Sequence, residues 1–466
     1  MQKLYFKTLS PVSITTGEKF SPYSDFVIDD KVYFLHQERI KDAFKQSPQM
    51  DSLIDEYVAG IVSRMDNNRS VFELKNFLSN RLKINFKEYA LRAIPKSKSV
   101  GNKDKIQITE IIKSPYFQPY IPGSSLKGAF KGALLYKWLI DSPEGKKWID
   151  EIYKISKLPK EDKNTKEAKK DIEKQLTSRY ESYEIALSDS TPMNTTDIKI
   201  YKIIRYHLKN SQKQASLPQF VEAITPETCF ETEFRPKEIS WETLQKALIQ
   251  YNQDANERDI RLAENFNVDT KLLDHYHQFA EKIKEGMCIF KIGSGKGYFF
   301  QSVGLAVFKQ KGKEAFQTFL EAYPPSSKKS NANSFPITKV VDADTLTPWG
   351  WVQVDTKVID TNKKAEEKPI EISTPAAKEP EKPKEIVAEY LKTGMKIKQN
   401  TEIDAVVVQS GKPNKVKLMI APDNEPIFEL RGYSSEIPEG TILICRVAQI
   451  NNKGKILDVS FSKLKN

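Results

Sequence analysis

The sequence has few of the residues that build metal centres and disulfide frameworks. Its 466 residues include three cysteines and four histidines. Cys229, Cys288 and Cys445 are isolated, which excludes a disulfide framework and a cysteine-based zinc site. Cys288 and Cys445 lie in apolar, strand-like runs, so we expect both in a packed core. His275 and His277 are two residues apart in an expected helix and would point in different directions, so no metal or other cofactor is expected.

Long hydrophobic runs are also missing. No apolar stretch approaches the roughly 20 residues that span a bilayer. The N-terminus alternates like a β-strand and lacks the apolar core of a signal peptide, so we expect a cytoplasmic protein. Lys and Arg number 73 against 62 Asp and Glu, a formal net charge of +11 with a pI near 9.1. This balance favours a polyanionic partner, although charge alone fits RNA, DNA or an anionic membrane surface equally well.

One glycine-rich loop resembles a nucleotide-binding loop but does not match the Walker A motif. In Gly293-Ser-Gly-Lys-Gly297, a Walker A loop would need glycine where Phe290 stands and Ser or Thr where Gly297 stands. A glycine loop after a strand can instead bring backbone amides to a nucleic-acid backbone, with Lys296 pairing with a phosphate. A tight hairpin turn without a ligand is the alternative. No base and nucleophile for a metal-independent ribonuclease can be assembled, so no catalytic residue is predicted.

The most informative stretch is a proline-glycine turn that runs into a helix, Tyr120-Ile-Pro-Gly-Ser-Ser-Leu-Lys-Gly-Ala-Phe-Lys-Gly-Ala-Leu135. Ser124 or Ser125 is expected to be the N-cap. Free amides and the positive end of the helix dipole would attract an anion at the exposed N-terminus. Lys127 and Lys131, four residues apart, share a face that could follow a phosphate backbone.

The rest of this helix shows two further patterns. A core-facing stripe is expected from four apolar residues, Leu126, Phe130, Ala133 and Leu134. Gly128 and Gly132 each cost roughly 1 kcal/mol relative to Ala inside a helix, so something is expected to pack very close to their face. The alternative is a helix that rests on a sheet, with glycines for tight packing and lysines for solubility.

Strands and helices are interspersed along the chain, which predicts an α+β fold. We expect a first domain over residues 1–156, a charged insertion at 157–183 that forms a solvated helix or mobile segment, and a second domain over 184–360. The segment 361–385, with prolines among Lys and Glu, is expected to be a disordered linker. Five short strands in 386–466 predict a small β-barrel of OB or S1-like type, a form common on single-stranded nucleic acid.

Five short motifs occur in an order typical of one family of proteins. They are Leu9-Ser-Pro-Val-Ser-Ile-Thr-Thr-Gly17, Ile121-Pro-Gly-Ser-Ser-Leu-Lys-Gly128, Leu187-Ser-Asp-Ser190, the loop from Gly293 to Gly297, and Pro348-Trp-Gly-Trp351. Together they resemble the RAMP superfamily of CRISPR-associated proteins, and within it the fifth subunits of type III-A (Csm) effector complexes. The resemblance covers about residues 1 to 355.

This resemblance implies two modified ferredoxin-like (RRM-like) RAMP domains that grip a guide RNA (crRNA). It implies phosphate contacts from a first group of residues, Gly123, Ser124, Ser125, Lys127 and Lys131. It implies a second cradle from the glycine loop, Gly293, Ser294, Gly295, Lys296 and Gly297. The expected protein is a noncatalytic subunit in antiviral defence that caps the 3′ end of the crRNA. It would contact the repeating backbone subunit, support crRNA maturation together with host trimming nucleases, and have no membrane partner.

The chain departs from the family pattern in its first motif. That motif often reads Pro-Val-His-Ile-Gly-Ser-Gly, whereas Ser13, Thr15 and Thr16 stand here, so no role for that His carries over. The charged insertion is long for its position, and the C-terminal barrel lies outside the common core. Three alternatives stay open: an endoribonuclease that processes CRISPR repeat RNA with His207 or Tyr298 as base, a subunit of the related Cmr-type complex, and an unrelated two-domain scaffold.

Overall fold

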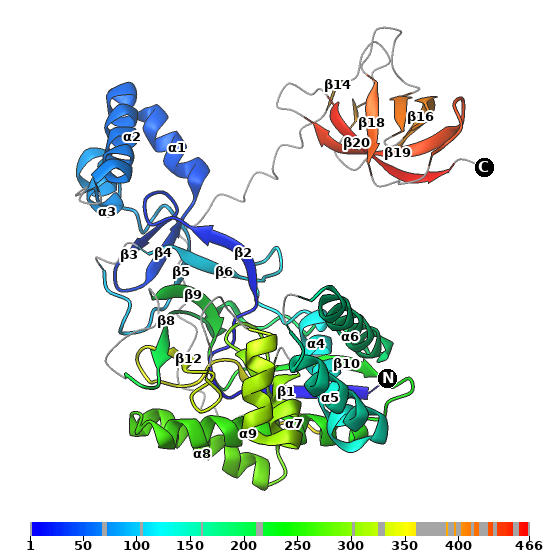
Figure 1. The fold of residues 1–466 in the computed structure, drawn as a ribbon. Helices are drawn as coiled ribbons and strands as arrows, with labels where there is room; N and C mark the ends of the chain where they lie inside the picture. The colour runs from blue at the N-terminus through cyan, green and yellow to red at the C-terminus, as the bar shows by residue number, and fades with distance from the viewer. Residues whose placement is uncertain are drawn as a thin grey trace. The chain divides into compact units, whose positions relative to one another are not determined.

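The structure is a computed structural model that describes most of the chain in two compact units, Met1–Lys364 and Ala365–Asn466 (Figure 1). It describes residues 2–67, 72–102, 106–159, 162–210, 218–300, 303–324, 331–359, 388–389, 396–397, 402–411, 414–418, 427–431, 436–450 and 456–464. The predicted linker at 361–385 lies outside the described residues.

The first unit contains an antiparallel five-stranded sheet with the order β11-β13-β1-β10-β7. Its strands are β1 (Gln2–Thr8), β7 (Ala186–Leu187), β10 (Cys229–Arg235), β11 (Cys288–Lys291) and β13 (Trp351–Asp355). Alternate residues of β1 are buried, including Leu4 and Phe6, as expected of a strand with one face on a core. The first strand of the chain therefore pairs with strands that follow it by hundreds of residues.

A second five-stranded sheet has the order β12-β8-β9-β6-β2. Its strands are β2 (Thr15–Phe20), β6 (Ile108–Ile111), β8 (Ile198–His207), β9 (Gln219–Ile224) and β12 (Thr338–Asp342). β6 and β9 pair in parallel, and the other neighbours are antiparallel. Both sheets combine strands from before and after the charged stretch at 157–183.

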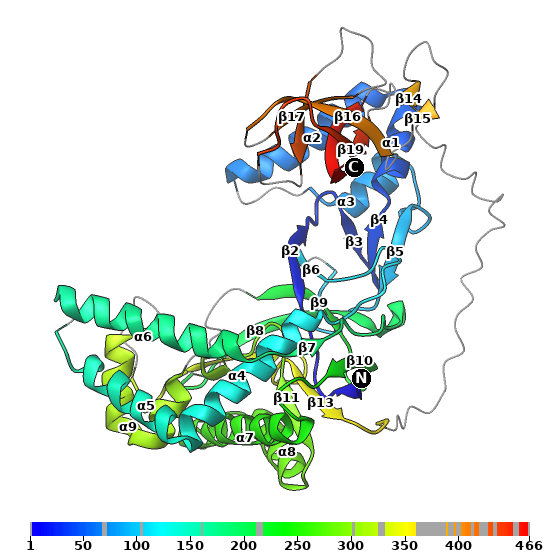
Figure 2. The same ribbon diagram turned by 90° about the vertical axis from the view of Figure 1, so that its right-hand side faces the viewer.

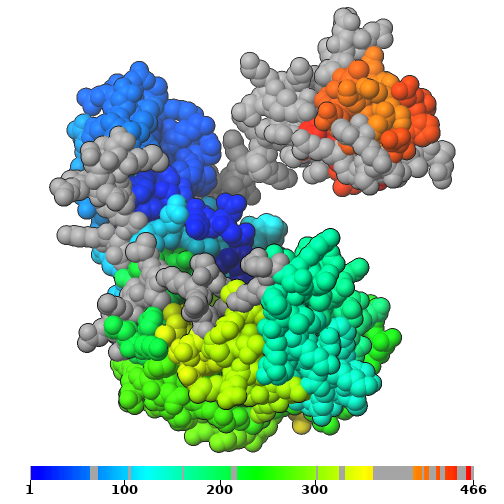
Figure 3. All heavy atoms as spheres, viewed as in Figure 1, coloured from blue at the N-terminus to red at the C-terminus, as the bar shows by residue number. Residues whose placement is uncertain are grey.

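Helices pack on the first sheet and on one another. They are α4 (Gly123–Asp141), α5 (Pro143–Ser156), α6 (Lys163–Ser182), α7 (Trp241–Asn265), α8 (Thr270–Lys284) and α9 (Gly304–Ala322). Figure 2 shows α4 between α6 and the pair α7 and α8, and α4 packs on both α7 and α6. Side chains of α5 and α9 lie next to each other on one face in Figure 3. The charged stretch therefore forms a helix, α6, that packs on α4.

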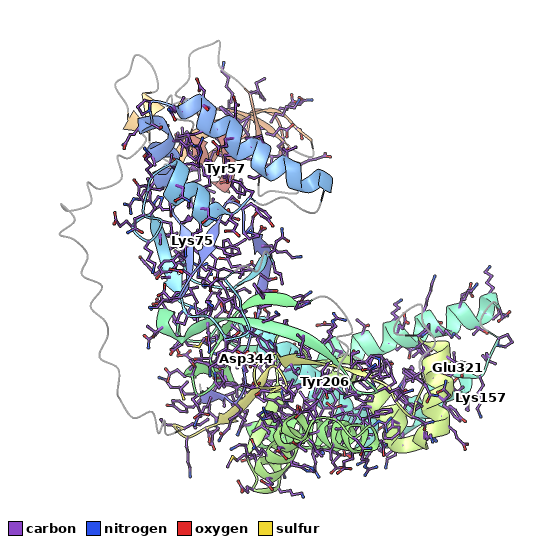
Figure 4. All side chains as sticks on the ribbon, turned by 90° about the vertical axis from the view of Figure 1, so that its left-hand side faces the viewer. Tyr57, Lys75, Lys157, Tyr206, Glu321 and Asp344 are labelled. Carbon is purple, nitrogen blue, oxygen red and sulfur yellow. The ribbon has the colours of Figure 1, made fainter. Side chains whose placement is uncertain are left out.

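A smaller group of helices covers a three-stranded sheet. The strands are β3 (Phe26–Ile28), β4 (Val32–Leu35) and β5 (Ala90–Ile94), and the helices are α1 (Gln37–Gln46), α2 (Met50–Asn67), α3 (Leu74–Asn76) and the π-helix η1 (Phe77–Arg81). Figure 4 shows Tyr57 among these helices. Its hydroxyl donates to the Tyr23 carbonyl at 2.9 Å, and burial raises the pKa of Tyr57 to about 12. This group thus has a core of its own.

The second unit contains a closed barrel with the strand order β16-β17-β18-β20-β19. Its strands are β16 (Glu402–Gln409), β17 (Lys415–Leu418), β18 (Phe428–Arg431), β19 (Ile442–Ile450) and β20 (Ile456–Leu464), and a short pair, β14 (Ala388–Glu389) and β15 (Lys396–Ile397), precedes them. Cys445 is buried in the barrel core, as expected. The mixed α/β class and the small barrel are confirmed. The ferredoxin-like arrangement and the domain boundaries stay predictions.

Candidate nucleic-acid interface

The N-terminus of α4 differs from the prediction in its cap. The helix begins at Gly123 and its N-cap is Pro122, which has no side-chain acceptor. The predicted caps, Ser124 and Ser125, lie inside the first turn instead, where the Ser125 amide donates to the Pro122 carbonyl at 2.9 Å. The Gly123 amide donates to Oδ1 of Asp189 at 2.7 Å. A carboxylate from a distant segment therefore occupies part of the anion position that helix amides and the dipole provide.

The turn before α4 is bound to the segment that follows β7. The Ile121 amide donates to Ser190 Oγ at 2.9 Å, and the Ser190 amide donates to the Ile121 carbonyl at 2.9 Å. A Cβ atom on Gly123 would lie 2.6 Å from the Leu187 carbonyl oxygen and 2.7 Å from that of Ser188. Only glycine fits there without a backbone shift. Two of the sequence motifs, 121–128 and 187–190, are therefore one structural junction.

The two lysines of the predicted phosphate-binding face have different surroundings. Lys127 is half-buried and forms no hydrogen bond or ion pair with the described residues. Lys131 Nζ lies 2.8 Å from Glu181 Oε2 and 5.4 Å from the centre of the Tyr180 ring. Because Glu181 is largely exposed, this pair contributes only about 0–1 kcal/mol, and a phosphate can compete for Lys131.

The glycine loop packs against the first and last sequence motifs. Gly293, Gly295 and Gly297 have φ values of 69°, 81° and 84°, in the left-handed region that favours glycine. The Ser294 amide donates to the Ser13 carbonyl at 2.9 Å, and a Cβ atom on Gly293 would collide with that oxygen. A Cβ atom on Gly295 would lie 3.0 Å from Cβ of Trp349. The motifs at 9–17, 293–297 and 348–351 therefore form a second junction, in which Trp349 is fully buried.

The loop and α4 meet at a cavity of about 370 Å³. Its lining includes Gly128 and Gly132 of α4 and Lys296 of the loop. Burial lowers the pKa of Lys296. Within the described part of the chain, nothing packs unusually close to the two glycines, because Cβ atoms there would lie 3.7 Å from Tyr180 Oη and 3.9 Å from Tyr251 Cε1, ordinary contact distances. The structure thus brings Lys296 of the second predicted group beside the helix of the first.

Four buried apolar residues of α4, Leu126, Phe130, Ala133 and Leu134, confirm the expected core stripe. Sequence reasoning missed the aromatic side chains that line the cavity, which are Tyr136 of α4 itself, Tyr180, Tyr251 and Phe300. The sequence gives a hint for one of them, because an aromatic residue such as Tyr180 is unexpected in a solvent-exposed stretch rich in Lys and Glu. The others lie in helical or loop segments where an aromatic residue predicts core packing.

A buried ion cluster supports the second sheet, and no motif pointed to it. Glu222 of β9 is fully buried, with one carboxylate oxygen 2.7 Å from Arg92 Nη2 and the other 2.5 Å from Lys113 Nζ. The Ile111 amide also donates to Glu222 at 3.2 Å. Among the described residues there is no group of three or more His, Cys, Asp or Glu side chains placed to bind a metal ion. None of the described helices is long and apolar enough to cross a membrane.

A family model of the RAMP superfamily matches residues 5–300. The match covers more than half of the chain, so the chain belongs to the RAMP superfamily. This confirms the resemblance drawn from the five motifs at the level of the superfamily. The C-terminal barrel lies outside the matched residues.

Two curated relatives carry the name CRISPR system Cms protein Csm5. The relative from Methanocaldococcus jannaschii is 24% identical over 380 residues, which cover 74% of this chain and 87% of that protein. The relative from Streptococcus thermophilus is 26% identical over 239 residues, 50% of this chain and 62% of that protein.

Solved structures show the same fold. One is a chain in the cryo-EM structure of a Csm–crRNA–target RNA ternary complex of a type III-A CRISPR-Cas system, with a TM-score of 0.53, 19% identity, and coverage of 76% of this chain and 100% of that chain. Another is the crystal structure of T. onnurineus Csm5, with a TM-score of 0.50, 18% identity, and coverage of 75% and 99%. The chain is therefore similar to Csm5 in sequence and in fold.

Proposed function

We propose that the chain is a noncatalytic, RNA-binding subunit of a type III-A (Csm) CRISPR effector complex. In this role it caps the 3′ end of the crRNA, contacts the repeating backbone subunit and supports crRNA maturation. Its similarity to Csm5 proteins and to a chain of a Csm–crRNA–target RNA complex supports the assignment to such a complex. The capping role and the lack of catalysis follow from the resemblance of the sequence motifs.

The observation that carries the RNA-binding role is the meeting of α4 with the glycine loop. Lys127 and Lys131 lie on α4, and Lys296 reaches the same helix from the loop across the cavity. Three cations on neighbouring segments can follow successive phosphates of one strand, while the turn amides of the loop lie beside them. Affinity would then come mainly from phosphate contacts and fall steeply as salt concentration rises.

The C-terminal barrel has a role of its own in this proposal. It binds RNA or recruits the host nuclease that trims the crRNA, since small closed barrels commonly hold single-stranded nucleic acid. A chain that ends at residue 385 separates these roles from those of the first unit. We expect it to retain the crRNA in the complex, with the 3′ ends left longer if the barrel recruits the nuclease.

The experiment that tests the proposal is a pull-down of the chain co-expressed with its genomic neighbours and a crRNA, followed by crosslinking and mapping of the bound RNA. We expect the wild type to retain the 3′ part of the crRNA and the double variant Lys127→Ala/Lys131→Ala to lose it while folding normally. Lys154→Ala/Lys163→Ala is the matched control, because it removes two lysines that are 73% and 89% exposed on α5 and α6.

Two outcomes would overturn the proposal. Unchanged crRNA retention in the α4 double variant would return this helix to a packing role. Cleavage of naked repeat RNA by the wild type, abolished by replacing His207 or Tyr298, would make the chain an endoribonuclease of the same superfamily instead.

A further inference from the structure

We propose that the cavity between α4, α6, α7 and the glycine loop holds one nucleotide of a single-stranded RNA, with its base against aromatic rings and its phosphate against Lys296. The inference rests on the proposed function, because it names the part of the bound RNA that this site would take. It goes beyond that function because α4 and the glycine loop were expected to contact RNA phosphates only, whereas the cavity would also hold a base.

The size and walls of the cavity fit a nucleotide. Its volume of about 370 Å³ lies within the range of roughly 300–1,000 Å³ that is common for ligand sites. One wall is a stacked pair, Tyr136 and Tyr251, with ring centres 4.6 Å apart. The Tyr136 hydroxyl donates to Asp254 at 2.7 Å and the Tyr251 hydroxyl donates to the Phe299 carbonyl at 2.5 Å. These bonds fix the rings before any ligand arrives, which is what a stacking platform needs.

The glycines of α4 give the cavity its depth. Gly128 and Gly132 are one helical turn apart and both line the cavity. Glycine weakens a helix, yet alanine would meet only ordinary contacts at either position, so packing within the protein does not require glycine. What the absence of two Cβ atoms provides is room in front of the helix backbone. A flat base can use this room to approach α4 closely.

Lys296 gives the cavity its charge preference. Its side chain is half-buried, and its Nζ forms no hydrogen bond or ion pair with any residue in the described parts of the chain. A partly buried ammonium without a counterion is disfavoured, whereas an anion beside it removes that penalty. None of the described lining residues is acidic. An incoming phosphate therefore has a cation to pair with and no carboxylate to repel it.

The rim of the cavity is formed by Tyr180 of α6. Its hydroxyl donates to the Gly128 carbonyl at 3.3 Å, and Lys131 lies over its ring while pairing with Glu181. The described lining contains no carboxylate or side-chain amide that could read a base edge. Stacking tolerates every base, so we expect the pocket to hold a nucleotide of any sequence.

The test uses the complex assembled with crRNAs that carry 4-thiouridine at single positions along the 3′ part. Ultraviolet crosslinking followed by peptide mapping shows which position lies against Tyr180 or Phe300. We expect one position to crosslink strongly, and Gly132→Leu, which fills the cavity, to lower that crosslink by about tenfold. Gly132→Ala is the matched control, because its Cβ atom fits, and it should crosslink like the wild type.

Two more variants keep the test decisive if Gly132→Leu does not fold. Tyr180→Ala removes the rim without adding volume, and Lys296→Met removes the charge at nearly constant length. Both should lower the crosslink to Phe300 when it is measured per crRNA retained by the same variant. An equally strong crosslink in all three variants would overturn the proposal.

Retention of crRNA tests the proposed function, and the crosslink to Tyr180 or Phe300 tests the nucleotide pocket. A wild type that retains no crRNA refutes the proposed function itself. A wild type that retains crRNA without any crosslink to Tyr180 or Phe300 refutes the pocket alone. Excess uridine monophosphate should not displace the crosslinked nucleotide, and displacement would assign the cavity to a free nucleotide rather than to an RNA strand.

Discussion

The buried lysine of β11, Lys291, should make the stability of the first unit depend on pH. Lys291 is only 5% exposed, and its Nζ lies 5.5 Å and 5.4 Å from the centres of the Phe300 and Trp351 rings. The nearby carboxylate of Asp259 is already paired with Lys339. Burial therefore lowers the pKa of Lys291 from 10.5 to about 8, with a smaller opposing effect of Asp259.

The pKa of Lys291 is lower in the folded chain than in the unfolded chain, so stability must change with pH. Between about pH 8 and pH 10.5 the unfolded chain holds a proton on Lys291 that the folded chain has lost, so the folding free energy becomes more favourable as pH rises through this window. Below pH 8 Lys291 is charged in both states, and its burial destabilises the folded state by about 3 kcal/mol, at 1.36 kcal/mol per pH unit. The two rings offset about 0.5–2 kcal/mol of it through cation–π attraction. A net cost of about 1–3 kcal/mol remains at pH 7.

The perturbation is Lys291→Met, which keeps the length of the side chain and removes its charge. We expect the variant to be about 1–3 kcal/mol more stable than the wild type at pH 7, with the difference shrinking towards pH 10. Urea unfolding at pH 7, 8.5 and 10, followed by tryptophan fluorescence, measures this. All five tryptophans lie before residue 352, so the signal reports on the first unit alone.

Lys357→Met is the matched control, because it makes the same change at an exposed position just after β13. It should shift stability little, and equally at every pH. Destabilisation by Lys291→Met at pH 7, or a difference that does not change with pH, would refute the reasoning that burial dominates over the aromatic contacts at this lysine.

Two further predictions concern the first junction and the buried ion cluster of the second sheet. Gly123→Ala should destabilise the first unit by about 1–3 kcal/mol in urea unfolding, because the added Cβ atom meets the Leu187 carbonyl oxygen at 2.6 Å, and unchanged stability would mean that the turn shifts freely. Glu222→Ala should cost about 3–5 kcal/mol, because it leaves buried Arg92 without an ion pair and Lys113 with Glu110 as its remaining partner, and a loss below about 1 kcal/mol would show that water reaches both cations.

Local patterns in the sequence predicted local structure well. The expected core stripe of α4 is buried, and alternation along residues 386–466 predicted a barrel that the structure contains. Both predictions depend on residues within a few positions of one another, where periodicity reports directly on the buried face.

Features that depend on distant segments could not be read in this way. The sequence favours nearby serines as the N-cap of α4, whereas Asp189, from the segment that follows β7, supplies the acceptor. Helical glycines such as Gly128 and Gly132 indicate close packing, but sequence alone does not show that their face borders a cavity rather than another helix. Tyr180 was hidden in a charged stretch whose composition predicts solvent exposure, although the helix it belongs to packs on α4.

Ser13 has a structural role at the position where the resemblance noted above would place a histidine. Its side chain is fully buried, and its hydroxyl donates to the Glu222 carbonyl at 2.8 Å. Its own carbonyl accepts from the Ser294 amide at 2.9 Å. One small residue therefore links the second sheet to the glycine loop, and the side chain has no access to solvent or to RNA. A larger side chain here would have to displace β9 or the loop, so a small residue is what this packing requires. The RNA contacts proposed for this chain consequently rest on α4 and the loop, which Ser13 helps to hold in place.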